Sequence, residues 1–298
     1  MAEIRILVPD DKAALETFLL PRVESSMFLI GNMRAAGLID SGQIYEGTYA
    51  AAFEGSGIVG VVAHFWNGML IFQAPAHLGA LWRAATRSSG RRIKGLIGPR
   101  EQVTAAKEDL GLRERMVQMD EIEYLYSLAL ADLVVPNRLR SGQLLGRRIE
   151  PRDLELVTGW RVAFAVQGLG EEESPRLWES TRASLTRSME RGWTWVLEDR
   201  GRPVATSSFN IAISEAVQIG GVWTPPELRR RGYGRAVVAV SLEDARAEGA
   251  TTAILFTGVD NIPAQRAYQA LGFRRIGDYR LLLLCQGFSV EDRVRGNR

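Results

Sequence analysis

The chain has 298 residues, too many for one small core, and its length suits two domains of about 150 residues each. Hydrophobic residues make up 46% of the chain and charged residues 24%, which excludes a largely disordered protein. The 37 basic and 35 acidic residues leave a formal net charge of +2, so we expect no nucleic-acid partner.

Cysteine and histidine are scarce. A single cysteine excludes an intrachain disulfide framework, and the two histidines, His64 and His77, show neither zinc-site spacing nor a hydrolase motif. Residues 1–5 lack the apolar core of a signal peptide, and the longest apolar stretch, 125–135, is too short to span a bilayer. We therefore expect a cytoplasmic protein that needs neither a metal nor a membrane.

The first half of the chain predicts alternating strands and helices. A strand at 4–8 ends in a Pro-Asp turn, and the helix that follows carries Leu15, Phe18 and Leu19 on one face. Glycine-containing turns at 54–57 and 67–68 then join three apolar runs, as in a meander of hairpins. The runs are 49–53, 58–65 and 69–73, and they precede a helix at 77–87, a strand at 94–97, a helix at 101–110 and a strand at 122–135.

The second half begins on the same plan about 140 residues later, which indicates a duplicated domain. A strand at 145–149, a Pro-Asp turn and a helix from Leu154 repeat the start of the chain. The later predicted elements are helices at 154–167 and 175–191, strands at 194–198, 203–210 and 216–224, a helix at 233–248, a strand at 252–257, a helix at 263–271 and a strand at 274–284. A polar stretch that contains proline and glycine separates the halves. The predicted domains are therefore 1–136 and 146–298, joined by a linker at 137–145.

The most informative segment joins the strand that ends at Thr224 to the helix that begins at Tyr233. Two prolines stop the strand, a basic turn follows, and Gly232 and Gly234 open the helix. Glycines let backbone N–H groups approach an anion, and a helix N-terminus adds positive dipole density. The same residues could also form an arginine-rich turn that is simply exposed to solvent. The pattern is neither a Walker A loop nor a Rossmann fingerprint. The arginines available for further phosphates are Arg229, Arg230, Arg231 and Arg235.

A second segment, 261–273, follows a buried strand and opens another helix. Together the two segments resemble the GNAT superfamily of N-acetyltransferases. The superfamily's loop pattern, Arg/Gln-x-x-Gly-x-Gly/Ala, is matched by Arg229, Gly232 and Gly234. Its later pattern, Asn-x-x-Ala-x-x-x-Tyr-x-x-x-Gly-Phe, is matched by Asn261, Ala264, Tyr268, Gly272 and Phe273.

The resemblance implies an α+β fold of two GNAT-like domains, each a mixed, mostly antiparallel sheet flanked by helices. The first domain is a degenerate copy, because residues 73–80 lack the glycine pair and the arginines of the loop. The implied activity is transfer of an acetyl group from acetyl-CoA, or a related acyl-CoA, to a primary amine of a small molecule or peptide by direct attack.

The resemblance also assigns roles to residues. Backbone groups of Val222, Trp223 and Thr224 would pair with the pantetheine arm of the cofactor like an added strand. Asn261 and Ala264 would contact the same arm, and Tyr268 would lie near the thiol as general acid. The pyrophosphate would be held by the segment made of Arg229, Arg230, Arg231, Gly232, Tyr233, Gly234 and Arg235.

The general base and the acceptor are left open. Many relatives place a glutamate on the strand before the loop, but here only Glu215 stands just ahead of it. A water relayed by backbone carbonyls, Ser207 or Gln218 is the alternative base. The aromatic residues that either line the acceptor pocket or pack in the core are Trp160, Phe164, Trp178 and Trp193.

Two other functions remain open from the sequence. One is a non-catalytic acyl-CoA sensor, and the other is a tandem transferase of the mycothiol-synthase or aminoacyl-transferase kind. Whether the protein forms a homo-oligomer is also open.

Overall fold

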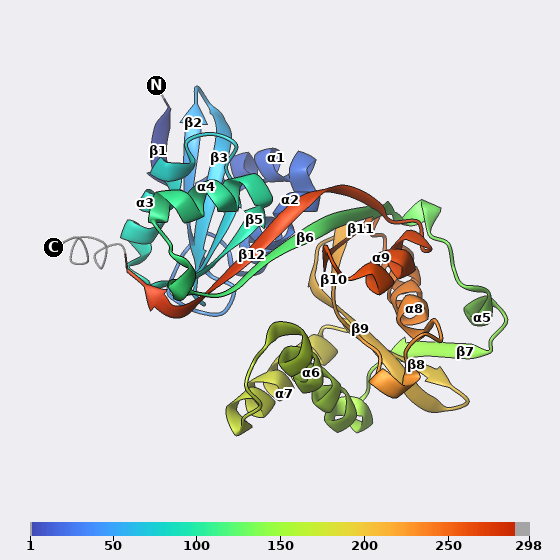
Figure 1. Ribbon diagram of the computed structural model, residues 1–298. Helices are drawn as coiled ribbons and strands as arrows, with labels where there is room; N and C mark the ends of the chain where they lie inside the picture. The colour runs from blue at the N-terminus through green and yellow to red at the C-terminus, as the bar shows by residue number, and fades with distance from the viewer. Residues whose placement is uncertain (1, 290–298) are drawn as a thin grey trace. The chain divides into compact units, whose positions relative to one another are not determined.

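The computed structural model describes residues 2–289 and divides them into two compact units (Figure 1). The first unit contains the residues up to Leu125 and those from Gly277 on, and the second contains Tyr126–Ile276. The boundaries fall inside two strands, β6 (Val117–Ala129) and β12 (Arg274–Phe288).

The first unit is built on a mixed sheet in which β1 to β5 and β12 follow one another in that order. Strands β4 and β5 are parallel, and the other neighbouring pairs are antiparallel. The strands are β1 (Glu3–Ile6), β2 (Gly47–Glu54), β3 (Gly57–Phe65), β4 (Met69–Gln73) and β5 (Ile93–Pro99). The helices that pack on this sheet are α1 (Lys12–Leu19), α2 (Val23–Ala36), α3 (Leu78–Ser89) and α4 (Arg100–Leu110).

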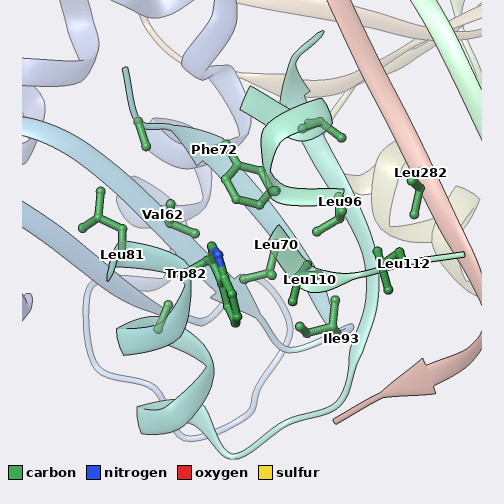
Figure 2. Close-up of a cluster of buried hydrophobic side chains, with 14 of the residues drawn as sticks. Val62, Leu70, Phe72, Leu81, Trp82, Ile93, Leu96, Leu110, Leu112 and Leu282 are labelled. Carbon is green, nitrogen blue, oxygen red and sulfur yellow. The ribbon is translucent and has the colours of Figure 1, made fainter. Parts of the chain in front are cut away.

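A cluster of buried side chains joins α3 and α4 to the sheet (Figure 2). Trp82 of α3, Phe72 of β4 and Leu96 of β5 are its centre, and Leu282 of β12 is as fully buried as they are. Strand β12 reaches this core because Tyr279–Leu283 pairs antiparallel with 95–99 of β5. The last strand of the chain therefore completes the core of the first unit.

The sequence places the strand at 274–284 at the end of the second domain, whereas its residues from Gly277 on belong to the first unit. The reason is the pairing with β5, which no local pattern in the sequence encodes. The boundaries of the compact units therefore differ from the boundaries of the duplicated sequence segments. The limits 1–136 and 146–298 stay a prediction about the duplicated segments, and the predicted linker contains the short helix α5 (Asn137–Arg140).

The second unit has the sheet order β11-β10-β9-β8-β7, with β10 and β11 parallel and the remaining pairs antiparallel. The strands are β7 (Leu144–Arg148), β8 (Thr194–Asp199), β9 (Arg202–Ala212), β10 (Ala216–Trp223) and β11 (Thr252–Gly258). The longer helices are α6 (Leu154–Leu169), α7 (Pro175–Glu190), α8 (Tyr233–Ala247) and α9 (Ile262–Gln269).

Both units repeat one order of elements, which confirms the predicted mixed and mostly antiparallel sheets flanked by helices. The repeat extends to side chains at the entry of the first helix. Asp11 accepts from the N–H of Val8 at 2.8 Å and from both terminal nitrogens of Arg5. In the second unit, Asp153 likewise accepts from the N–H of Glu150 at 2.8 Å and from Arg147.

Candidate functional site

The connection between β10 and α8 turns sharply at two left-handed residues. A single 3-10 turn, Pro226–Leu228, follows the strand. Arg230 then has φ +63° and Gly232, the N-cap of α8, has φ +78°. Left-handed backbone is strained for any residue except glycine, so the turn costs free energy that a functional role explains.

Six consecutive backbone N–H groups in this connection lack a hydrogen-bond acceptor among the described residues. They run from Arg230 to Arg235, and the first bond of the helix is made by the N–H of Ala236 to the oxygen of Gly232 at 3.0 Å. The segment Arg229–Gly232 is exposed, so an anion can reach these donors from solvent. A loop of free amides at the start of a 15-residue helix is suited to a phosphate group.

The arginines of the loop differ in their surroundings. Arg229 lies over the ring of Trp223 at 4.8 Å, and its Nε donates to the carbonyl of Thr224 at 3.1 Å. Arg230 and Arg231 are exposed. Arg235 is half-buried in the first turn of α8, and its Nε has no partner in the described chain. The loop therefore combines one arginine fixed against the strand with two that are free to meet a ligand.

Two residues outside the motif hold the loop in place, and the sequence reasoning missed both. Arg138 of α5 donates to the carbonyl of Arg231 at 3.2 Å and to Asp199 Oδ2 at 3.0 Å. The hydroxyl of Tyr233 donates to the same carboxylate at 2.5 Å. The hydrogen bond from Tyr233 and then that from Arg138 lower the pKa of Asp199 below its ordinary value. Tyr233 is predicted to bind the cofactor, and its hydroxyl stabilises the loop through the hydrogen bond to Asp199.

Strands β10 and β11 pair only over part of their length. Parallel pairing runs from Ala216 opposite Thr252 to Ile219 opposite Leu255. Beyond it, β10 has a bulge against β9, where the register shifts between Gly220 and Trp223 and Gly221 has φ +59°. The bulge turns the end of β10 out of the ladder. The segment predicted to pair with an extended ligand, Val222, Trp223 and Thr224, lies past this point.

Helix α9 starts beside the end of β11. The side-chain oxygen of Asn261 accepts from the N–H of Ala264 at 3.3 Å and so caps the helix. Gln265, which the sequence reasoning missed, donates through Nε2 to the carbonyls of Gly258 and Val259 at 3.0 and 2.8 Å. These bonds fix α9 to the strand and with it the position of Tyr268.

Tyr268 is half-buried on α9, and its ring meets that of Phe273 edge-on at 6.0 Å. Burial raises the pKa of its phenol to about 12, because the phenolate is poorly solvated. No described residue forms a hydrogen bond with the hydroxyl. The side chain can therefore donate a proton to a ligand at neutral pH.

Glu215 lies just before the start of β10, whereas the bulge and the loop are at the end of this strand. It lies in the turn before β10, where its carbonyl accepts from the N–H groups of Thr251 and Thr252. Gly221 lies six positions further along the chain, about 20 Å away in an extended strand. Ser207 contacts Ser241 of α8 at 3.5 Å. Gln218 is buried, donates to the carbonyl of Ile219 at 3.1 Å, and leaves its Oε1 without a partner in the described chain.

A polar cluster, Arg161, Thr194 and Ser208, lies where α6 covers β8 and β9. Arg161 Nη2 lies 2.5 Å from Ser208 Oγ and 3.3 Å from Thr194 Oγ1, and the two hydroxyls are 3.1 Å apart. Burial lowers the pKa of the Arg161 guanidinium to about 10. The cluster adjoins the bulge, because a Cβ built on Gly221 would lie 3.8 Å from Ser208 Oγ and 4.0 Å from Arg161 Nη2.

The four aromatic residues that the sequence assigned either to the acceptor pocket or to the core lie in several environments. Phe164 of α6 meets Trp223 edge-on at 6.2 Å, beside the bulged strand. Trp160 packs on the small core between α6, α7 and β8. Trp178 is 37% exposed, and Trp193 lies against Arg191 at 4.9 Å. Of these four, Phe164 is the one at the bulge.

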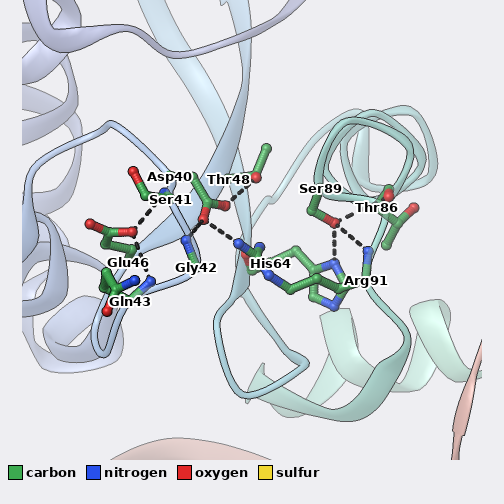
Figure 3. Close-up of polar contacts among 10 residues, drawn as sticks. All are labelled: Asp40, Ser41, Gly42, Gln43, Glu46, Thr48, His64, Thr86, Ser89 and Arg91. Atoms are coloured by element: carbon green, nitrogen blue, oxygen red, sulfur yellow. Dashed lines mark hydrogen bonds and ion pairs between the residues drawn. The ribbon is translucent and has the colours of Figure 1, made fainter.

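The described residues of the first unit contain no comparable loop. Helix α3 begins directly after a short turn at His77, without the arginines of the second unit. A polar network elsewhere in this unit surrounds His64, whose Nδ1 lies 2.6 Å from Ser89 Oγ (Figure 3). Asp40 pairs with Arg91 and Thr48 instead of the imidazole, so these residues do not form a Ser-His-Asp triad. Burial and the charge of Arg91 lower the pKa of His64 to about 4, so the ring is neutral.

Within residues 2–289, no group of three or more histidine, cysteine or acidic side chains is placed to hold a metal ion. The same residues contain no helix that is both long and apolar enough to cross a bilayer.

Residues 160–273 match the model of the acetyltransferase (GNAT) family, and this stretch contains the loop, the bulge and α9. A search of curated proteins finds no match.

Solved structures similar over nearly the whole chain extend the comparison to both units. A Drosophila protein has 15% identity and a TM-score of 0.66, with 95% of this chain and 99% of that one covered. A GNAT-family acetyltransferase from Colwellia psychrerythraea has 15% identity and a TM-score of 0.54, with 96% and 100% covered. A tandem GNAT protein from the clavulanic acid biosynthesis pathway has 13% identity and a TM-score of 0.54, with 96% and 98% covered. At such low identity the likeness shows the fold alone.

Proposed function

We propose that residues 160–273, which match the model of the acetyltransferase (GNAT) family, transfer an acetyl group from acetyl-CoA to a primary amine. The observation that carries the proposal is the run of six backbone N–H groups, 230–235, that point to no acceptor in the described chain. The amine belongs to a small molecule or a peptide. When bound, acetyl-CoA supplies an acyl thioester that a neutral amine attacks directly.

The residues present fit this cofactor along its length. The free amides and the exposed Arg230 and Arg231 suit the pyrophosphate and a further phosphate. The end of β10 beyond Ile219 has left the β11 ladder, so backbone groups of Val222 and Thr224 can pair with the amides of a pantetheine arm. Asn261 and Ala264 at the start of α9 border the same space, with the Asn261 amide nitrogen available as a donor.

We assign the protonation of the leaving thiolate to Tyr268. Its raised pKa, about 12, keeps the phenol protonated at neutral pH, and its hydroxyl is not engaged by the described residues. A donor with these properties can give a proton to a sulfur that becomes negative as the thioester breaks.

For removal of the amine proton, we propose a water held by Gln218 Oε1. This oxygen is buried, lacks a partner in the described chain, and lies on the strand that bulges two residues later. Glu215, another candidate from the sequence, lies about 20 Å from the bulge along the strand.

The test is to incubate the purified protein with acetyl-CoA and a panel of primary amines and to follow thiol release together with the mass of the product. Thiol release that depends on the amine, with a product heavier by one acetyl group, supports the proposal. Tight binding of acetyl-CoA without turnover on any amine would instead favour the acyl-CoA sensor.

A further inference from the structure

The strongest unexplained feature of the second unit is the guanidinium of Arg161 on α6, whose Nε is buried and which has no carboxylate partner among the described residues. Its described hydrogen bonds go to the hydroxyls of Ser208 and Thr194, and its Nε has no partner in the described chain. Leaving a buried charge uncompensated is strongly unfavourable, and neutral residues can join a helix to a strand without that cost. The arrangement is therefore that of a receptor for an anion.

A second buried polar atom without a partner lies on the same helix. Thr158 precedes Arg161 by three residues, so the two share a face of α6. The Thr158 hydroxyl is buried and, within the described chain, forms no hydrogen bond. Buried hydroxyls are normally satisfied, so an unpaired hydroxyl on the same helix face as an unpaired guanidinium N–H favours a ligand with several acceptor atoms.

The position of the guanidinium limits what this ligand is. Arg161 Nη2 lies within 4.0 Å of the Cβ position of Gly221, the left-handed residue in the bulge of β10. The bulge is where β10 leaves β11, and the proposed acyl group enters beside it. An anion at Arg161 is therefore within a few bond lengths of the attacking amine. A guanidinium binds carboxylate and phosphate through its planar, two-donor edge, and carboxylate is the smaller of the two and the one that is planar.

We propose that the acceptor is an amino acid or a similar short amine whose carboxylate is bound by Arg161, with Ser208 and Thr158 donating further hydrogen bonds. This inference rests on the proposed acyl transfer and names the substrate class of the same site. Arg161 positions the acceptor, and it takes no part in proton transfer.

The chemistry of the acceptor gives a matched pair of probes. Glycine, alanine, leucine and glutamine are each compared with the corresponding carboxamide, which keeps the amine and loses the negative charge. We expect the wild-type kcat/KM to be at least about 100-fold higher for the acids, since an unpaired buried guanidinium is a strong penalty for the amides. Arg161→Gln should reduce this ratio to near one, mainly through KM, and Arg161→Lys should retain part of it.

Two results would overturn the inference. One is a wild-type protein that uses carboxamides as well as acids. The other is an Arg161→Gln variant that slows both members of each pair equally, because that would place Arg161 at the acyl group or in the fold alone. Acetyl-CoA affinity of each variant reports on folding, and Arg176→Gln on exposed α7 controls for the loss of a positive charge.

A binding measurement separates failure of this inference from failure of the proposed function. N-acetylalanine, added with CoA, should raise the thermal midpoint of the wild type but not that of Arg161→Gln, and N-acetylalaninamide should raise neither. If no amine is acetylated but this pattern holds, the transferase proposal fails and the carboxylate site stands. If the acid and the amide shift the midpoint alike, the carboxylate site is wrong whatever the activity.

Discussion

Arg147 of β7 and Asp153 at the entry of α6 form a two-bonded ion pair, with Nη1 2.6 Å from Oδ2 and Nη2 3.0 Å from Oδ1. Arg5 and Asp11 make the same pair six residues apart in the first unit. Arg147 also binds Glu198 of β8, so the pair fixes the first helix of the second unit to two strands. The position of α6, and of Arg161 on it, depends on this contact.

Asp153→Asn should lower the free energy of unfolding of the second unit by about 3 kcal/mol at neutral pH, because the Asp153 side chain is only 5% exposed and its arginine loses a partner. Urea unfolding followed by tryptophan fluorescence measures the difference. Asp10→Asn, at an exposed position beside the equivalent pair, is the control and should have little effect.

The contribution of the Asp153 carboxylate to the free energy of unfolding should decrease as the pH falls. Burial raises the pKa of Asp153, but hydrogen bonds from Arg147 and from the N–H of Glu150 outweigh it, so the folded-state pKa is lowered. Stability from the carboxylate is therefore present above its unfolded pKa of about 4 and is lost as the pH falls through the lower folded value. The difference between wild type and Asp153→Asn should shrink in acid, and a difference that grows there would contradict the assignment.

Leu282→Ala should destabilise the first unit although the residue stands near the end of the chain. Leu282 is fully buried in the core that contains Trp82, and truncation of a buried leucine costs about 3 kcal/mol. Hydrogen exchange should show faster opening of β3, β4 and β5. Ile276→Ala, at a position 46% exposed, should leave these strands protected. Faster exchange confined to β8 and β9 would show that β12 stabilises the second unit instead.

Arg138→Leu should weaken acetyl-CoA binding about tenfold, although the residue lies outside the loop. Its loss frees the Arg231 carbonyl and leaves Asp199 with the Tyr233 hydroxyl alone, so the amides of the loop are less well ordered. Arg140→Leu on the same short helix is a matched control, since its side chain is exposed and binds Asn137. If both variants bind acetyl-CoA with equal affinity, Arg138 does not order the loop.

Tyr268→Phe should lower kcat by about 100-fold and leave the affinity for acetyl-CoA nearly unchanged, as expected for loss of a general acid. Because burial raises the pKa of the phenol to about 12, the hydroxyl stays protonated through about pH 10. The pH profile of the wild-type kcat should thus show no alkaline loss from this group below that point. A fall in kcat with an apparent pKa near the ordinary tyrosine value, absent from Tyr268→Phe, would contradict the burial of the acid.

Local pattern in the sequence predicts most of the elements of both units. Hairpin signals such as Asn67–Gly68 fall between β3 and β4, and the strand predicted at 216–224 is observed as Ala216–Trp223. These signals are local, since a turn residue or an alternation of apolar side chains acts over a few neighbouring residues. The family match at 160–273 spans the motifs around Gly232 and Tyr268.

The features that the sequence did not reveal depend on contacts between distant segments. Leu282 is 186 residues from its pairing partner Leu96, and no sequence pattern in either segment predicts this pairing. Arg138 and Arg161 are single arginines in ordinary helical sequence, and their roles come from Asp199 and Ser208 on other elements. Glu215 precedes β10 and lies far from the bulge along the strand, a separation that the sequence alone does not show.

The most direct test of the central claim is calorimetric titration of acetyl-CoA into the wild type, Gly232→Asp and Gly249→Asp. Both glycines have positive φ and open space around them, and they lie at opposite ends of α8, so the two variants add the same charge and similar strain. We predict micromolar binding by the wild type and by Gly249→Asp, and a loss of at least about 100-fold in Gly232→Asp, where the carboxylate competes for the amides of 230–235. Equal affinities in all three proteins, or no binding by the wild type, would contradict the account of the loop as a pyrophosphate site.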